Sequence, residues 1–315
     1  MISILTRRFV GPMAFLLSAA FSLGAPAKVG VLLKSKAPFW GAVEKGAAEA
    51  GAALGAEIVV KAPMSESDIS VQVQLLNALV RQEVQAIVIA PDNKDALAGT
   101  VAAAAAKGIK IVALDSPLAG DAASVLIGTD QNAAGAAAGT LMASLLKETD
   151  ELALLKHNQN GGATEQRELG AIEKIRAKWP KLVIHGDIYA GTESGTEEQK
   201  AELLLTKHPQ SKGILASSTP GTMAMLKVLK AKGLAGKIQF VGFGYNLNPE
   251  VAAAIESGAM QGWIAQLPRN VGYKGVETAL ALLKGEKPAA VIHIDFVVIT
   301  KDNLKTPAVQ ALLAP

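Results

Sequence analysis

Several aromatic, charged and amide side chains follow short apolar runs of the sequence. Phe39 and Trp40 come after VGVLL, Asp115 comes after IVAL, and Gln266 comes after GWIA. In open α/β sheets, ligands bind just beyond the carboxyl ends of such strands. The C–H faces of a sugar pack on aromatic rings, while carboxylate, guanidinium and amide groups exchange hydrogen bonds with hydroxyls. We therefore predict a site for a neutral, hydroxyl-rich molecule, formed by Phe39, Trp40, Asp115, Arg167, Ser218, Phe243 and Gln266.

Each of these residues also has a purely structural alternative. Trp40 could belong to the core between a helix and a sheet, and Asp115 could cap the turn LDSP. Arg167 could be a solvated charge on an amphipathic helix, and Gln266 could satisfy backbone groups at a strand end. Ser218 lies in Ser-Ser-Thr-Pro, which is a favourable helix N-terminus without any ligand.

The sequence lacks the common catalytic and cofactor-binding motifs. It contains no GxxxxGK[ST] loop and no GxSxG elbow, and Gly242-Phe243-Gly244 lacks the third glycine and the acidic residue of a dinucleotide fingerprint. With no cysteine, thiolate metal sites and disulfides are excluded. The histidines stand alone in sequence, outside any ligand pair; they are His157, His185, His208 and His293. The sequence therefore predicts neither an enzyme nor a cofactor or metal site.

Short β-branched apolar runs alternate with longer Ala/Leu-rich segments that have helical spacing. This alternation predicts parallel sheets covered by helices on both faces. The predicted strands are 28–33, 57–60, 86–90, 109–114, 124–128, 151–155, 182–188, 213–217, 238–243, 260–265 and 291–299. The predicted helices are 39–54, 68–82, 93–107, 131–147, 163–178, 195–208, 221–232, 248–257 and 270–284. So many strands suit two doubly wound α/β lobes, with an eight-stranded α/β barrel as the alternative.

The N-terminal residues have the pattern of a secretory signal peptide. Arg7 and Arg8 precede an apolar run that is too short for a membrane span, and Ala25-Pro26-Ala27 predicts cleavage after Ala27. An uncleaved anchor is the alternative. The net charge of the 315-residue chain is +3 and falls to +1 without these two arginines, which gives no reason to expect nucleic acid as a partner.

Several segments together resemble the ribose-type periplasmic binding proteins, the type I sugar-binding components of ABC importers. The matching segments, in order, include APFWGAVEKGAAEAGAALGAE, IKIVALDSP, IGTDQNAAGAAAG, LLTKHPQSKGILASST, VGFG and WIAQLPRNVGYKGVETALALLKGEKP. The resemblance covers nearly the whole chain after the predicted signal peptide. It implies two lobes that close on a ligand, with three crossings near Thr129, Leu267 and Asp295. The expected domains are 1–27 as signal peptide, 28–128 plus 267–294 as N-terminal lobe, and 129–266 plus 295–315 as C-terminal lobe.

The resemblance also implies roles for the candidate residues and shows where this sequence departs from the family. Phe39 and Trp40 match the pair that stacks on the sugar, and Asp115 matches the acidic residue that binds its hydroxyls. The remaining candidates match contacts from the opposite lobe or the hinge. The family's ribose binders have Asn at position 37, Arg at 116, Asp at 244 and Asn at 218, where this chain has Ala37, Ser116, Gly244 and Ser218.

These departures make ribose itself an unexpected ligand, because buried hydroxyls without partners each cost about 1–3 kcal/mol. A different pentose, a deoxy sugar, a linear polyol or a smaller molecule with fewer hydroxyls is expected. Tyr189, Thr192 and Tyr245 are possible replacement contacts. The expected function is a monomeric periplasmic carrier that delivers its solute to an ABC permease. The alternative is a sensor that presents the same solute to a membrane receptor or kinase.

Overall fold

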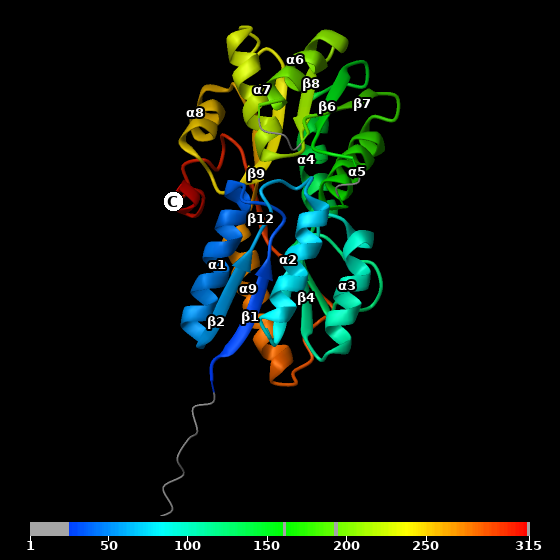
Figure 1. Ribbon diagram of the computed structural model, residues 1–315. Helices are drawn as coiled ribbons and strands as arrows, with labels where there is room; N and C mark the ends of the chain where they lie inside the picture. The colour runs from blue at the N-terminus through cyan, green and yellow to red at the C-terminus, as the bar shows by residue number, and fades with distance from the viewer. Residues whose placement is uncertain (1–24, 160–161, 192–194, 314–315) are drawn as a thin grey trace, which may run out of the picture.

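The protein folds into two α/β lobes, each built on one six-stranded sheet (Figure 1). The computed structural model describes residues 25–159, 162–191 and 195–313, so residues 1–24, which contain most of the predicted signal peptide, lie outside the described residues. The first sheet has the order β11-β5-β4-β3-β1-β2 and the second has the order β12-β10-β9-β8-β6-β7. The predicted two-lobed parallel architecture is confirmed, and the alternative of a single barrel is wrong.

All strand pairs are parallel except β10 with β12. The first sheet comprises β1 (Ala27–Leu32), β2 (Ala56–Lys61), β3 (Ala86–Ile89), β4 (Lys110–Leu114), β5 (Val125–Thr129) and β11 (Val291–Ile294). The second comprises β6 (Glu151–Lys156), β7 (Val183–Tyr189), β8 (Gly213–Ala216), β9 (Gln239–Tyr245), β10 (Gly262–Gln266) and β12 (Phe296–Ile299).

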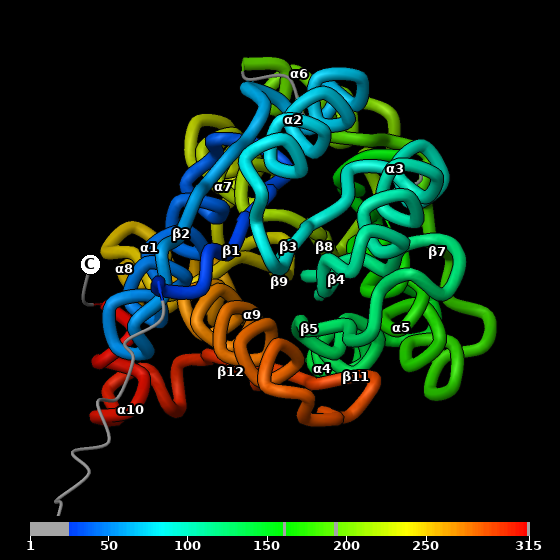
Figure 2. Tube along the Cα trace, turned by 60° about the horizontal axis from the view of Figure 1, so that its bottom comes forward, coloured from blue at the N-terminus to red at the C-terminus, as the bar shows by residue number. Residues whose placement is uncertain are grey.

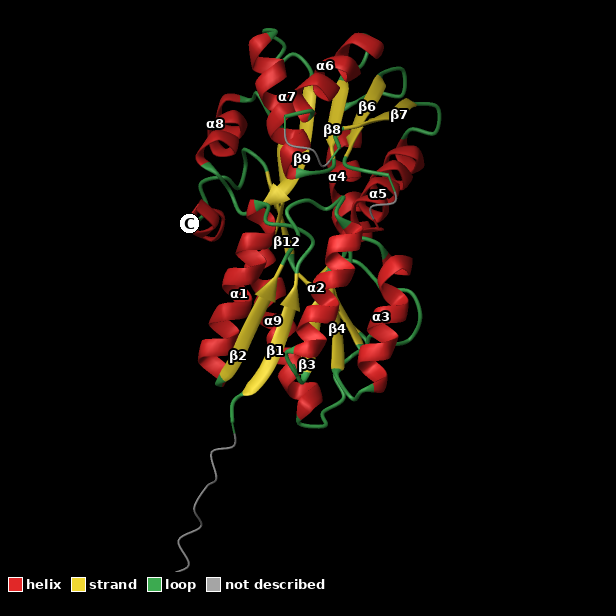
Figure 3. Cartoon of the chain, in the orientation of Figure 1, coloured by secondary structure: helices red, strands yellow, loops and turns green. Residues whose placement is uncertain are grey.

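Helices cover both faces of each sheet (Figure 3). The N-terminal lobe has α1 (Pro38–Leu54) and α9 (Pro268–Leu283) on one face, and α2 (Ile69–Arg81) and α3 (Lys94–Ala106) on the other. The C-terminal lobe has α4 (Gln131–Leu145) and α5 (Gly162–Lys178) on one face, and α6 (Glu197–Lys207), α7 (Thr219–Ala231) and α8 (Pro249–Ser257) on the other. The chain ends with α10 (Pro307–Gln310) and a 3-10 turn, Ala311–Leu313, which pack on the C-terminal lobe and were not predicted.

The strand sequences explain why both faces are covered. In β3, Val88 packs toward α1 and α9, while its neighbours Ile87 and Ile89 pack toward α2 and α3. Successive strand side chains point to opposite faces, so a strand that is apolar at every position must be buried on both. These residues are all fully buried.

The chain passes between the two sheets three times. It leaves β5 for α4, returns from β10 to α9, and crosses again between β11 and β12. The prediction of one strand over 291–299 is wrong: β11 pairs with β5, β12 pairs with β10, and Asp295 lies between them. The alternation of β-branched residues alone gives no sign that the two halves of 291–299 join different sheets, although the resemblance implied a crossing near Asp295.

Close helix pairs set the positions of several site residues. Helix α9 lies along α1, as Figure 2 shows, and α4 packs on α5 in the other lobe. At Gly135 of α4, an added Cβ would lie 1.9 Å from the backbone oxygen of Arg167 in α5. Only glycine permits this approach, and it brings Arg167 next to the start of α4.

No helix within the described ranges is both long and apolar enough to cross a bilayer.

Candidate ligand-binding site

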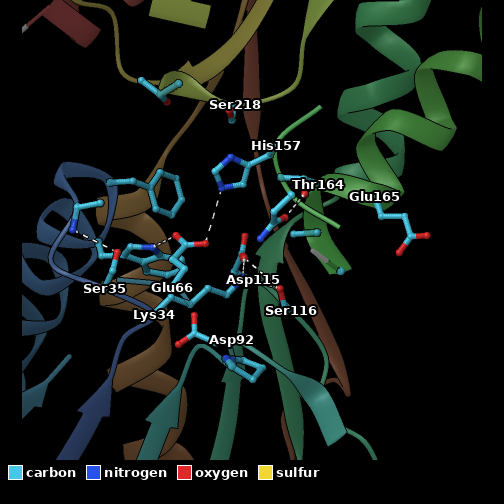
Figure 4. A pocket seen from close by; sticks show the side chains of 18 of the residues that line it. Lys34, Ser35, Glu66, Asp92, Asp115, Ser116, His157, Thr164, Glu165 and Ser218 are labelled. Atoms are coloured by element: carbon cyan, nitrogen blue, oxygen red, sulfur yellow. Dashed lines mark hydrogen bonds and ion pairs between the residues drawn. The ribbon is translucent and has the colours of Figure 1, made fainter. Parts of the chain in front are cut away.

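A cavity of about 950 Å³ lies between the two lobes, beyond the carboxyl ends of strands from both sheets (Figure 4). The N-terminal lobe lines it with Lys34, Phe39, Trp40, Glu66, Asp92, Asp115 and Ser116, among others. The C-terminal lobe adds His157, Arg167, Ser218, Tyr245 and Gln266. A site of this size and position suits a small ligand held by both lobes.

The aromatic part of the cavity wall begins at the first turn of α1. Pro38 starts this helix, so Phe39 and Trp40 directly follow the end of β1 and its loop. Phe39 packs edge-on against Trp40, with ring centroids 4.9 Å apart, and against Tyr245, at 5.6 Å. Trp40 is only 3% exposed, and its Nε1 donates to Glu66 Oε1 at 2.8 Å. Trp40 therefore both belongs to the core of its lobe and lines the cavity.

A buried ion pair lies at the ends of β1 and β4. Lys34 Nζ donates to Asp115 Oδ2 and to Ser116 Oγ, at 2.8 Å each. Burial opposes the charge on Lys34, but the carboxylates of Asp115 and Glu66 more than offset it, so the pKa of Lys34 is raised. Asp115 has a φ of +62°, a left-handed conformation that aspartate tolerates better than most residues. The Lys34 ammonium therefore stays charged and is already engaged by protein groups.

Arg167 belongs to a second network, at the hinge side of the cavity. Its Nε and Nη2 donate to Gln131 Oε1 at 3.0 and 2.6 Å, and Gln131 Nε2 donates to Gln266 Oε1 at 2.9 Å. Arg167 Nη1 also donates to the backbone oxygen of Ser217. Burial lowers the pKa of Arg167 to about 10, which leaves the guanidinium charged at neutral pH. Through Gln131, this network fixes Arg167 of α5 relative to Gln266 of β10.

The structure places six of the seven predicted site residues in the cavity wall. These are Phe39, Trp40, Asp115, Arg167, Ser218 and Gln266. Phe243 is the exception: it is fully buried, does not line the cavity, and lies under Arg167 with its ring centroid 4.6 Å from the guanidinium carbon. Phe243 was predicted to contact the ligand, but in the structure it packs behind Arg167 and supports that side chain.

Ser218 and Gln266 line the cavity and also make the helix-capping and backbone contacts that were their structural alternatives. Ser218 Oγ accepts from Gly221 N at 3.3 Å and so caps α7. Gln266 Nε2 donates weakly to the backbone oxygen of Gly244 at 3.4 Å. Of the three suggested replacement contacts, Tyr245 lines the cavity and Tyr189 does not, while Thr192 lies outside the described residues.

Sequence reasoning missed several charged or titratable residues of the cavity wall, among them Lys34, Glu66, Asp92 and His157. Glu66 is held ionised, because His157, Lys34 and Trp40 together outweigh its burial and lower its pKa to about 2. Asp92 is the opposite case, since burial and the neighbouring Glu66 raise its pKa to about 8. The strand-end rule could have found Asp92, which follows β3 and Pro91. No local signal in the sequence marks Glu66, which lies in a loop.

The described residues contain no group of three or more His, Cys, Asp or Glu side chains placed to hold a metal ion. The cavity wall instead offers aromatic rings, the ammonium groups of Lys34, Lys36 and Lys94, the guanidinium group of Arg167, carboxyl groups and amides. Such a set recognises hydroxyl groups by stacking and by charge-assisted hydrogen bonds.

Comparisons with known proteins agree with this geometry. The D-allose-binding periplasmic protein of Escherichia coli (strain K12) is 28% identical over 280 residues, which cover 86% of this chain and 88% of that protein. A carbohydrate transporter solute-binding protein from Agrobacterium radiobacter, in complex with D-arabinose, is similar in structure, with a TM-score of 0.85 and 28% identity over 92% of this chain and 99% of that one. An ABC transporter solute-binding protein from Agrobacterium vitis with bound D-fucose has a TM-score of 0.81 and 30% identity, over 91% of this chain and 100% of that one.

The model of the periplasmic binding protein domain matches residues 29–287 of the chain. This range includes parts of both lobes and the first two of the three crossings. Proteins of this kind bind solutes without converting them. The chain therefore belongs to the periplasmic binding protein family.

Proposed function

We propose that the protein captures a small neutral sugar or polyol between its lobes, in the periplasm, and delivers it to the permease of an ABC importer. The observation that carries this proposal is the cavity itself, whose wall combines Phe39 and Trp40 with hydrogen-bonding groups from both sheets. The sugars bound by the relatives described above support the ligand class. The sensor alternative has no comparable support among these relatives.

The mechanism that fits this architecture is closure of the lobes around the ligand. We propose that residues 28–128 plus 267–294 move as one lobe and residues 129–266 plus 295–315 as the other, with the crossings as hinges. A ligand that contacts both lobes binds more tightly to the closed form than to an open one, and it shifts the population toward closure by that difference in affinity. The closed form, acting as a monomer, would then present a joint surface of both lobes to the permease.

A thermal-shift screen tests the proposal. D-allose, D-arabinose, D-fucose, D-ribose and xylitol are added separately to the purified protein. A sugar at 100 times its Kd adds about 2.7 kcal/mol to the free energy of unfolding, which raises the melting temperature measurably.

Two variants test whether the sugar binds in this cavity. Trp40→Ala removes an indole from the cavity wall, and Asp115→Ala removes the carboxylate that engages Lys34. Both should remain folded by circular dichroism and lose the sugar-induced shift. Trp179→Ala is the matched control, because that indole donates to Ala143 O, and Trp179 does not line the cavity. A normal shift in both site variants, or no shift with any sugar in the wild type, contradicts the proposal.

A further inference from the structure

The buried polar atoms without hydrogen-bond partners gather in the cavity wall. Across residues 25–159, 162–191 and 195–313, the buried side-chain nitrogen and oxygen atoms that lack a partner are Asp92 Oδ1, Asp92 Oδ2, His157 Nδ1 and Ser211 Oγ. Three of these four atoms belong to residues that line the cavity, and Ser211 does not line it. Because a buried polar atom without a partner is unfavourable, a group of them in one cavity wall indicates contacts that a ligand completes.

The backbone of Asp92 is held in place while its carboxyl group is left free. Asp92 N donates to Gln72 Oε1 at 2.9 Å. Gln72 is fully buried, and its side-chain Nε2 donates to Leu33 O and Ala90 O, at 3.1 and 2.8 Å. Gln72 thus ties the ends of β1 and β3 to the loop that carries Asp92. Lys34, the cation whose charge acts on Asp92, is already paired with Asp115.

His157 occupies the corresponding place on the other lobe. It is the first residue after β6, and its Nε2 lies 3.8 Å from Glu66 Oε2, across the cavity (Figure 4). That contact leaves Nδ1 as the ring atom without a partner. Asp92 and His157 therefore present unused hydrogen-bonding atoms from opposite lobes to one cavity.

We propose that Asp92 and His157 bind the ligand from opposite lobes. The Asp92 carboxylate accepts hydrogen bonds from two neighbouring hydroxyl groups of the ligand, and His157 Nδ1 forms a hydrogen bond with a further hydroxyl group of the ligand. This inference rests on the proposed function, because it assigns two contacts within the same sugar site. It also gives closure a physical basis, since a ligand bridging Asp92 and His157 holds the two lobes together.

The charges around Asp92 favour hydroxyl donors over an anionic ligand group. Asp92 is surrounded by Glu66, Asp68 and Lys34, and burial together with Glu66 raises the pKa of its carboxyl group to about 8. A carboxylate or phosphate on the ligand would add negative charge beside these acids. Hydroxyl groups instead donate to the carboxylate and favour its ionised form.

Isothermal titration calorimetry tests these contacts, with the sugar that gives the largest thermal shift as the probe. Asp92→Ala should raise the Kd at least about tenfold, because hydrogen bonds to a charged group are lost. Asp92→Asn, which keeps the shape of the side chain, should also weaken binding. Asp121→Asn removes an exposed acid from the same lobe and should leave the Kd unchanged.

The two ring nitrogens of His157 can be separated by substitution. A glutamine amide reaches about the position of Nε2, and an asparagine amide reaches about that of Nδ1. His157→Gln should therefore keep a donor for Glu66 and raise the Kd about fivefold, whereas His157→Asn should bind the sugar more tightly than His157→Gln.

Monodeoxy analogues of the same sugar complete the test. For the analogues that lack the hydroxyls bound by Asp92, the wild type and Asp92→Ala should have the same Kd within about twofold, because the partner of Asp92 is already gone. If Asp92→Ala binds the parent sugar as tightly as the wild type does, this inference is wrong and the proposed function stands. If the wild type binds none of the sugars, both are wrong.

Discussion

Asp92 should make the ligand-free protein less stable as the pH rises. Its folded pKa is about 8 against an ordinary value of 3.8, chiefly because of burial, with repulsion from Glu66 and Asp68 and partial relief from Lys34. The folded protein therefore binds this proton more tightly than the unfolded chain does. The contribution of Asp92 to the free energy of unfolding is therefore highest below pH 3.8 and falls as the pH rises toward 8.

The expected size of this effect follows from the pKa difference. Each pH unit between the two pKa values lowers the free energy of unfolding by about 1.4 kcal/mol. Between pH 5 and pH 8, the contribution of Asp92 falls by about 4 kcal/mol, which corresponds to about 8 °C in melting temperature for a chain of this size. Asp92→Asn cannot titrate, so this part of the pH dependence should disappear.

Urea unfolding of the ligand-free wild type and Asp92→Asn, at several pH values from 5 to 8, measures the difference. Other titrating groups are common to both proteins, so the difference between the two curves isolates Asp92. Asp121→Asn, which lacks an exposed acid instead, should follow the wild type. Parallel curves for the wild type and Asp92→Asn would refute the argument, because they would show that the Asp92 carboxyl group is solvated in the folded protein. A saturating sugar should reduce the pH dependence of the wild type, since its hydroxyl groups stabilise the carboxylate.

Two further predictions concern packing and the lobe contact. Gly46→Ala would place a Cβ 1.9 Å from Arg269 O, so it should lower the free energy of unfolding by about 3 kcal/mol. An added Cβ at Gly41, in the same helix, meets nothing within 4 Å, so Gly41→Ala should raise the free energy of unfolding by about 0.5–1 kcal/mol. Urea unfolding that gives the two variants equal stability contradicts this packing. The pKa of Glu66 is lowered from 4.5 to about 2, so its carboxylate stabilises the fold above pH 4.5 and this contribution is lost as the pH falls toward 2. Glu66→Gln should remove about 3 kcal/mol of that acid sensitivity, and an unchanged acid-unfolding midpoint would show that His157 and Lys34 do not stabilise the Glu66 carboxylate as described.

Much of the architecture could be predicted because each element carries its own pattern. Strands such as 86–90 are apolar at every position, and the helices between them repeat apolar residues at helical spacing. The spacing of apolar residues does not fix where a helix starts: α9 begins at Pro268 rather than at the predicted residue 270, since proline suits the first helical turn. The apolar pattern of 291–299 does not show its division between two sheets, because that division depends on which strands are already present at each sheet edge; only the family resemblance implied a crossing near Asp295.

The site was predictable only as far as it follows strand ends. Asp115 directly follows β4, Gln266 is the last residue of β10, and both line the cavity. Phe243 satisfies the same rule by position, yet its side chain points to the core side of its sheet, where Arg167 covers it. Glu66 and His157 meet only because two lobes approach each other. No spacing within one segment of sequence carries that information.

The cavity wall bears directly on which ligand is expected. Ribose binders of the family carry Asp at position 244, but here an added Cβ at Gly244 would lie 2.0 Å from the ring of Trp263, so the indole occupies the space of that side chain. They carry Arg at position 116, whereas here Lys34 supplies a cation that donates to Ser116 Oγ at 2.8 Å. Asp92 adds a carboxyl group whose two oxygens have no partner among the described residues. Lys34 and Asp92 therefore supply a cation and a carboxyl group that residues 116 and 244 lack. Because these groups come from other positions than in the ribose binders, we expect a ligand whose hydroxyls are arranged differently from those of ribose.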